Sequence, residues 1–334
     1  MSQLTADFLL LLVTLIWGTS FVIVKKAIST MGPLTFIAVR FLIAGLVLLV
    51  WHVARAGRPP KAGKKAGKKA APRGDSGAGE PDGAQGKSRR EPAGARWFDA
   101  SRQFYMGGAL TGAALFFSYA TQTLGLVTVG AGKAAFITGL YVVIVPVASR
   151  ALLKVVPDRA SIFGVILATA GLGLLSLNLP IRIAPGDFLV FLCALGFAAH
   201  ILLVGHYSSR GDTVLFAAIQ LLVVSAGSFI CALIAERPIT VAASAWGAIL
   251  FTAIAATSFA FLAQSAVQRY TSPTHTALIF SAEPVFGALF AWLLAGEVLL
   301  AREIVGAVGI LAGIILSEVG SMRGSSGAKE RAKE

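Results

Sequence analysis

The stretch SAEPVFGALFAWLLAGE, residues 281–297, places a carboxylate and a proline inside a segment that is otherwise apolar enough to lie in lipid. A helix that begins near Pro273 and rises about 1.5 Å per residue carries Glu283 to a depth of about 15 Å, close to the middle of a bilayer. A charge at that depth is costly unless it faces a wet cavity or a partner. Pro284 also removes one backbone donor. These two residues together predict a kinked helix that lines a cavity.

The whole chain shares this apolar character. Hydrophobic residues make up 56% of it and charged residues only 13%, with a mean hydropathy of +0.78, which is typical of an integral membrane protein. A span needs about 20 mostly apolar residues. The sequence therefore predicts an all-α membrane protein with ten transmembrane helices. The expected spans cover approximately residues 6–28, 34–53, 104–124, 131–151, 160–177, 185–206, 213–235, 243–268, 273–295 and 302–320.

Residues 54–103 are the exception to the apolar pattern. This segment is rich in Gly, Ala and Pro and holds thirteen Lys and Arg residues against five acidic ones, so we expect a disordered loop. It has no aromatic interleaving, which argues against nucleic acid and favours anionic lipid headgroups as its contact. By the positive-inside rule the loop and both termini are cytoplasmic, with 22 basic residues inside and five outside. We expect a multi-pass protein of a bacterial inner (plasma) membrane.

An internal repeat is visible when residues 135–174 are laid over residues 277–316. The two segments share ten identities without a gap, among which Gly164 and Gly171 fall on Gly306 and Gly313. The chain is therefore interpreted as two five-helix halves, and an odd number of spans inverts the second half relative to the first. Inverted repeats place a substrate site at their interface near the bilayer midplane. The expected units are 1–53 with 104–179, the loop 54–103, residues 180–320, and a cytoplasmic tail at 321–334.

Several segments resemble the EamA-type permeases of the drug/metabolite transporter superfamily. They are LIWGTSFVIVKKAI (15–28), RFLIAGLVLL (40–49), YATQTLGLVTVGAGKAAFITGLYVVIVP (119–146), the stretch 281–297, and GAVGILAGIIL (306–316). The resemblance covers the chain except 54–103, where the family has a short connection. It implies ten helices with cytoplasmic termini, two inverted repeats around a central cavity, and secondary transport of small metabolites, often outward.

The candidate cavity residues are polar or aromatic side chains inside the expected spans. They are Trp17, Ser20, Arg40, Tyr119, Gln122, Lys133, Tyr141, His200, Gln264 and Glu283. Tyr141 is the repeat equivalent of Glu283. Arg40 and Lys133 either offer positive potential to a carboxylate or phosphate of the substrate, or pair with Glu283 or with helix ends and hold the fold. The amides and His200 either bind a polar solute or satisfy neighbouring helices.

The favoured function is secondary transport of a small amphipathic metabolite, an amino acid or related compound, with export preferred over uptake. A coupling proton or an exchanged solute is compatible with this interpretation. No cofactor or metal is expected: the chain has no phosphate-binding loop and no HExxH, and its two cysteines, Cys193 and Cys231, fall within spans and are interpreted as packing residues. The alternatives are a membrane-embedded enzyme, a passive channel, and an interaction protein recruited through the 54–103 loop.

Overall fold

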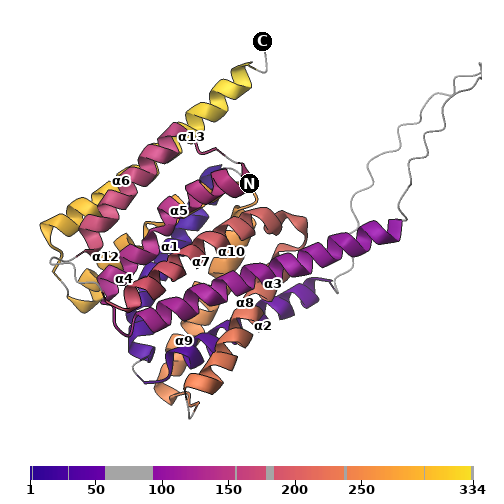
Figure 1. Ribbon diagram of the computed structural model, residues 1–334, viewed down its shortest axis with the longest axis vertical. Helices are drawn as coiled ribbons and strands as arrows, with labels where there is room; N and C mark the ends of the chain where they lie inside the picture. Colours follow the sequence, from indigo (N-terminus) through magenta and orange to yellow (C-terminus); the bar gives the residue numbers. More distant parts are fainter. Residues whose placement is uncertain are drawn as a thin grey trace, which may run out of the picture.

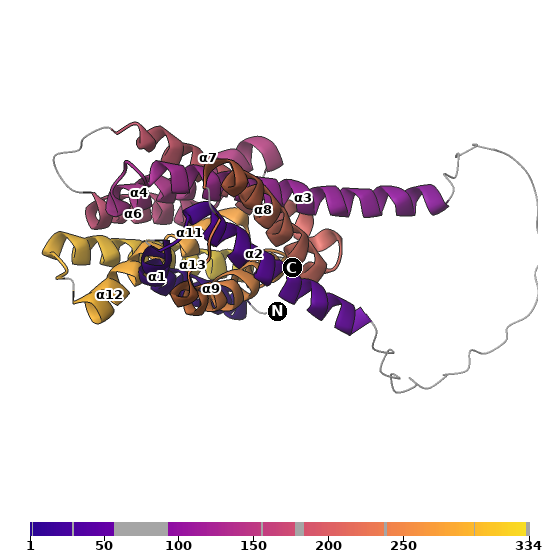
Figure 2. The same ribbon diagram turned by 90° about the horizontal axis from the view of Figure 1, so that it is seen from below.

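The computed structural model is a bundle of helices (Figures 1 and 2). It describes residues 1, 3–28, 30–56, 93–154, 156–177, 184–236, 239–296 and 298–331, and this part of the chain contains no strand. The all-α fold class is confirmed. The elements are α1 (Gln3–Ile28), α2 (Pro33–Ala56), α3 (Ala93–Gly125), α4 (Ala131–Gly139), α5 (Tyr141–Ala148), η1 (Ser149–Leu153), α6 (Arg159–Ser176), α7 (Gly186–Tyr207), η2 (Ser208–Arg210), α8 (Thr213–Ala235), η3 (Ala243–Ala245), α9 (Trp246–Ala253), η4 (Ile254–Phe259), α10 (Ala260–Val267), α11 (Pro273–Phe280), α12 (Glu283–Ala295) and α13 (Ala301–Arg331).

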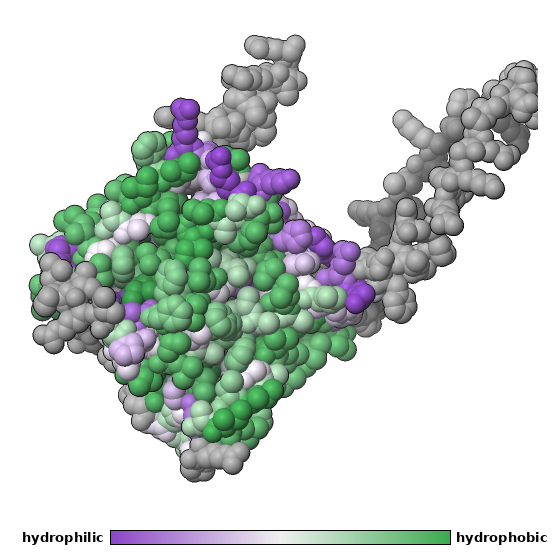
Figure 3. Space-filling view, viewed as in Figure 1, coloured by the Kyte–Doolittle hydropathy of each residue, from purple (hydrophilic) through white to green (hydrophobic). Residues whose placement is uncertain are grey.

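Nine stretches of the described residues are long and apolar enough to cross a membrane. The expected span 104–124 is not one of them: it lies in α3, which has 33 residues but carries Thr111, Ser118, Thr121 and Gln122 among its apolar side chains. The count of ten spans therefore stays a prediction. Figure 3 shows a surface dominated by apolar side chains, with hydrophilic ones gathered where α3 and α13 project. Such a surface suits contact with lipid tails.

The ends of the basic loop differ from the expected limits of 54–103. Helix α2 continues to Ala56, and α3 begins at Ala93, so the first and last residues of the expected loop are helical. Residues 57–92 lie outside the described part of the chain. The expected tail is likewise helical at its start, because α13 runs on to Arg331. The apolar spans thus continue into helix that is too polar to be recognised by hydropathy.

The helix boundaries repeat along the chain. The starts of α4, α5 and α6 precede the starts of α11, α12 and α13, respectively, by one constant interval, which is also the interval between the repeated sequence segments. The starts of α2 and α8 are separated by a longer interval, and the extra residues of the first half fall in the segment that contains the basic loop. Equivalent starts at three successive helices are stronger evidence of a duplicated unit than the ten sequence identities, since shared apolar composition does not produce them.

The two halves meet through their equivalent helices. In α6 and α13, which lie side by side in Figure 1, a Cβ on Gly171 would lie 2.5 Å from the carbonyl oxygen of Gly306, and one on Gly164 would lie 2.6 Å from that of Gly313. A later residue of α6 thus meets an earlier residue of α13, so the two helices run antiparallel. Only glycine permits this approach of one backbone to another.

Helices of one half also pack against those of the other. Helix α1 contacts α10, α11 and α12, whereas its equivalent α7 contacts α3, α4 and α5. At Gly18 a Cβ would lie 2.6 Å from the Cβ of Phe286, so α1 and α12 touch closely there. The largest buried cluster accordingly combines residues of both halves, such as Leu10 and Val142 with Leu278. The interior between the halves is where the site is found.

Candidate functional site

The helix around Glu283 is interrupted next to Pro284, where the sequence predicts a kink. Helix α11 ends at Phe280, Ser281 and Ala282 form a turn, and Glu283 is the first residue of α12. Pro284 therefore occupies the second position of a helix, where the backbone amide has no partner in the helix in any case. The proline starts α12, and Ser281 and Ala282 keep right-handed helical backbone angles between α11 and α12. The kink itself stays a prediction.

The equivalent helix of the first half is broken at the equivalent place. Helix α4 ends at Gly139, Leu140 lies between, and Tyr141 is the first residue of α5. Glu283 and Tyr141 thus occupy matching positions directly after matching breaks. Helix breaks at membrane depth leave backbone groups that must be satisfied by protein or by water in a cavity.

The Glu283 carboxylate keeps its hydrogen-bonding capacity. The side chain is half-buried, and the part of the chain that the structure describes forms no hydrogen bond or ion pair with it. Arg40 acts on it electrostatically without forming an ion pair. Two opposite charges therefore face the same region and stay apart.

Arg40 is held by side chains of helices other than the one that carries Glu283. Its side chain is buried; Nε donates to Oγ1 of Thr257 at 2.6 Å, and the guanidinium lies 5.3 Å from the ring centre of Phe41 and 5.9 Å from that of Tyr119. Contacts of this kind with aromatic faces stabilise a desolvated cation. The charge of Arg40 is thereby fixed in place even without a carboxylate partner.

Trp17 is hydrogen-bonded to the same segment as Arg40. Its indole Nε1 donates to the carbonyl oxygen of Ala256 at 2.8 Å, and its ring lies 4.9 Å from that of Phe280 and 5.6 Å from that of Phe261. Ala256 and Thr257 both belong to η4, a π-helical segment. π-Helical turns are rare and are found frequently at functional sites. Here the segment supplies the acceptors that orient Trp17 and Arg40.

We call Arg40, Tyr119, Tyr141, Cys193 and Glu283 the central polar cluster. These side chains come from five helices, α2, α3, α5, α7 and α12, and interact with one another electrostatically. Aromatic rings surround them: Tyr119 lies 5.1 Å from Phe41 and 5.6 Å from Phe197, and Tyr141 lies 6.4 Å from Phe197. The arrangement offers a cation, a carboxylate and hydroxyl groups within an aromatic wall.

Lys133 lies elsewhere. It forms an ion pair with Asp187, which fastens the start of α4 to the start of α7. Ser20 donates to the carbonyl oxygen of Trp17 in its own helix at 2.8 Å. Both contacts fit the structural role that was the alternative for polar groups in the spans.

The other candidates form hydrogen bonds with neighbouring side chains. His200 contacts Oε1 of Gln220 through Nε2 at 3.0 Å, and Gln264 donates to Gln268 at 2.9 Å. Both candidates are buried. Gln122 donates to Thr138 at 3.4 Å, and the Thr138 hydroxyl lies 3.9 Å from the sulfur of Cys193. Gln122 therefore borders the central polar cluster, whereas His200 and Gln264 do not.

Two residues at or beside the central polar cluster were not among the predicted site residues. Cys193 was interpreted as a packing residue, and Thr257 carries no signal in the sequence, because a threonine inside a span is ordinary. The π-helical segment that presents Thr257 has no sequence motif either. Only its small and hydroxyl residues, IAATSF over 254–259, distinguish it from its neighbours.

The apolar helical bundle defines an integral membrane protein, and comparison with known proteins gives its family. The EamA-like transporter family matches residues 4–70, 87–177 and 184–318. The chain belongs to this family, which confirms the resemblance drawn from the sequence. It is a multi-pass membrane transporter.

Relatives agree with this assignment. An "Uncharacterized transporter" of Archaeoglobus fulgidus is 31% identical over 314 residues, which cover 94% of this chain and 86% of the relative. A solved structure described as "Crystal structure of protein" superposes with a TM-score of 0.72 at 17% identity, over 96% of this chain and 99% of that one. The second comparison concerns the fold alone.

Proposed function

We propose that the protein is a secondary transporter that moves a small amphipathic metabolite, an amino acid or a related compound, by alternating access. The observation that carries the proposal is the central polar cluster, in which Arg40 and Glu283 face one region without pairing. A zwitterion would place its carboxylate near Arg40 and its ammonium near Glu283, and its side chain would contact the rings of Tyr119, Phe197 and Trp17. Such a solute completes the interactions that the two charges leave open.

Alternating access is supported by the pairing of equivalent helices. Helices α6 and α13 run antiparallel and meet at repeat-equivalent glycines, as expected for units 1–53 with 104–179 and 180–320 that are inverted copies. Inverted copies can exchange conformations, so that the cluster opens first to one side and then to the other. The proposed direction of transport is export, because members of the family often transport outward. Both termini and the 54–103 loop would lie on the cytoplasmic side of a bacterial inner membrane. The loop would contact anionic headgroups there.

The test is transport by the full chain in proteoliposomes, with zwitterionic amino acids as the first probes. Loss of one interaction with a charged group costs about 1.5–3 kcal/mol, so Glu283→Gln is expected to reduce transport about 10- to 150-fold. Asp212→Asn is the matched control: Asp212 caps α8 by accepting from the amide of Leu215 at 2.9 Å, and asparagine caps helices equally well.

Several outcomes would contradict the proposal. Unchanged transport in Glu283→Gln removes Glu283 from the site, and a Glu283→Gln profile that follows the wild type across roughly pH 5–8 removes proton coupling through this residue. A chain that lacks the loop should still transport. Complete loss of activity on deletion of the loop would favour the interaction protein recruited through it.

A further inference from the structure

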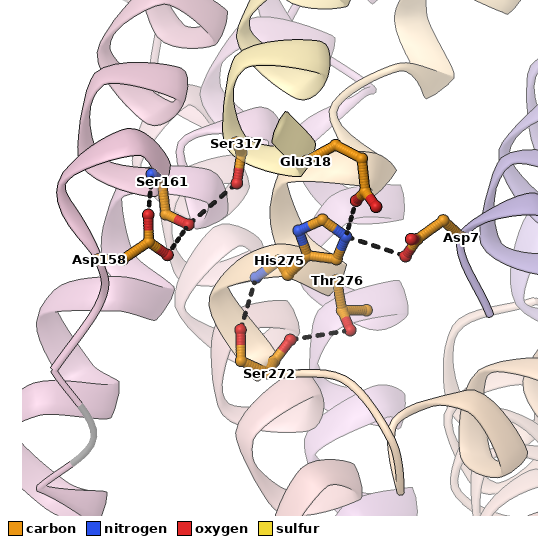
Figure 4. A network of polar contacts seen from close by, with 8 residues as sticks. All are labelled: Asp7, Asp158, Ser161, Ser272, His275, Thr276, Ser317 and Glu318. Atoms are coloured by element: carbon orange, nitrogen blue, oxygen red, sulfur yellow. Dashed lines mark hydrogen bonds and ion pairs between the residues drawn. The ribbon is translucent and has the colours of Figure 1, made fainter. Parts of the chain in front are cut away.

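A second cluster of charged side chains lies at the end of the bundle where α1 begins. His275 of α11 lies between two carboxylates (Figure 4): its Nε2 is 2.9 Å from Oδ1 of Asp7 in α1 and 3.1 Å from Oε2 of Glu318 in α13. Asp7 and His275 are 8% and 4% exposed, and the side chain of Glu318 is 18% exposed. No residue of this cluster belongs to the central polar cluster. We call these three residues the end cluster.

The end cluster is short of positive charge. It holds two carboxylates and one imidazole, so its net charge is −2 with a neutral ring and still −1 with a protonated one. Nε2 can carry only one proton, which it can donate fully to only one carboxylate. Within the described part of the chain, Oδ2 of Asp7 and both oxygens of Glu318 are buried and accept no hydrogen bond, although Oε2 of Glu318 forms the ion pair with His275. Buried carboxylates in this condition require a further cation or proton.

At the other end of the bundle, the repeat-equivalent carboxylate is neutralised by a lysine. His275 is the third residue of α11 and corresponds to Lys133, the third residue of α4, while Asp7 of α1 corresponds to Asp187 of α7. Lys133 and Asp187 form an ion pair. A carboxylate on the first helix of one half thus meets a cation on the fourth helix of the other half. At the end cluster an imidazole stands in place of the ammonium and a second carboxylate, Glu318, is added.

We propose that Asp7, His275 and Glu318 bind a divalent transition-metal ion, for which Zn²⁺ is the best match. Imidazole nitrogen and carboxylate oxygen are both good Zn²⁺ ligands, and two carboxylates balance its charge. Their ligand atoms all lie within 4.8 Å of one another. Three protein ligands leave the fourth position of a tetrahedral ion for water. Ca²⁺ and Mg²⁺ fit less well because they prefer six or more oxygen ligands and do not select imidazole.

The geometry requires only a small adjustment. Ligands on a tetrahedral Zn²⁺ with bonds of about 2.0–2.2 Å lie about 3.4 Å apart. The nitrogen–oxygen distances of 2.9 and 3.1 Å are shorter than this, so the carboxylates must move outward by a few tenths of an ångström. Side-chain rotation alone can provide that. The bound ion would join α1, α11 and α13, which come from both halves of the chain.

Metal binding by the full chain in detergent tests the proposal, with any affinity tag removed and metal stripped by a chelator. Equilibrium dialysis against Zn²⁺ should return one bound ion per chain. Asp7→Asn and His275→Gln should each weaken binding at least tenfold. His52→Gln is the matched control, since His52 also contacts a carboxylate, that of Asp212 at 3.1 Å, but among the described residues it belongs to no set of three possible metal ligands. It should bind Zn²⁺ like the wild type.

A further variant, His275→Lys, keeps the test decisive if Asp7→Asn and His275→Gln fail to fold. His275→Lys copies the arrangement of the opposite end and supplies the missing charge covalently. It should fold without metal, bind no Zn²⁺, and show a melting temperature that added Zn²⁺ does not change, whereas that of the wild type rises. A wild-type chain that binds no Zn²⁺, or His275→Lys binding as tightly as the wild type, would overturn the proposal.

Discussion

Gly171→Ala tests the contact between the two halves of the chain. The added methyl group would lie 2.5 Å from the carbonyl oxygen of Gly306 and 2.8 Å from the backbone nitrogen of Ile310. Ordinary contact begins near 3.4 Å, so α6 and α13 must separate by about 0.9 Å at this point. Backbone atoms of a helix cannot move aside as a flexible side chain does. Overpacking costs about 1–3 kcal/mol, against which alanine gains about 0.8–1.0 kcal/mol over glycine in a helix.

The expected net effect is therefore a loss of up to about 2 kcal/mol in the free energy of unfolding. Gly173→Ala is the control on the same helix, because its methyl group would lie 3.6 Å from the ring of Phe136 and 3.9 Å from Leu177. That variant should be as stable as the wild type or slightly more stable. Unfolding by SDS in mixed micelles, followed by circular dichroism, measures both. Equal stability of the two variants would refute the close packing of α6 on α13.

Two further predictions concern single hydrogen bonds. Trp17→Phe removes the donor to Ala256 but keeps an aromatic ring, so it should lower the free energy of unfolding by about 1 kcal/mol in the same assay, and no loss would mean that the bond contributes nothing. Asp158 caps α6 by accepting from the amide of Ser161 at 2.9 Å; partial burial raises its pKa, but hydrogen bonds from the Ser161 hydroxyl and from backbone amides outweigh burial and hold the pKa below its usual value. Asp158→Ala should therefore lower the free energy of unfolding by about 1 kcal/mol at pH 7. Because a lowered pKa stabilises the fold only while the carboxyl is ionised, the difference in stability between variant and wild type should shrink as the pH falls below about 4. A difference that stays constant with pH would contradict this cap.

Hydropathy and spacing were enough to predict the fold class and most span positions. The repeat offset also matched Glu283 with Tyr141, and in the structure each of them is the first residue of a helix, α12 and α5. These inferences succeed because burial in lipid imposes a strict composition on each span, and because a duplicated unit keeps the positions of its helix ends. The limits of 54–103 were less accurate, since polar helix and polar loop have similar compositions.

The details of the site depend on pairings that no local pattern encodes. Lys133 and Asp187 lie 54 residues apart and meet only because α4 packs on α7. Asp7 and His275 meet across 268 residues. Hydropathy cannot distinguish a histidine that lies between two acids from one that bonds an amide, as His200 does. The interruption before Glu283 could not be located from the sequence, because proline is compatible with a kink and with a helix start, and the turn at Ser281 and Ala282 contains no glycine.

The packing of α1 against α12 has a consequence for the making of this protein. Helix α1 ends at Ile28, and α12 begins only at Glu283, so most of the chain is synthesised between them. At about 5–20 residues per second, roughly 13–50 s pass before the ribosome has produced the partner of α1. Throughout that interval Gly18 lacks its final neighbour in α12, Phe286. The final packing of this part of α1 can therefore form only when the chain is nearly complete.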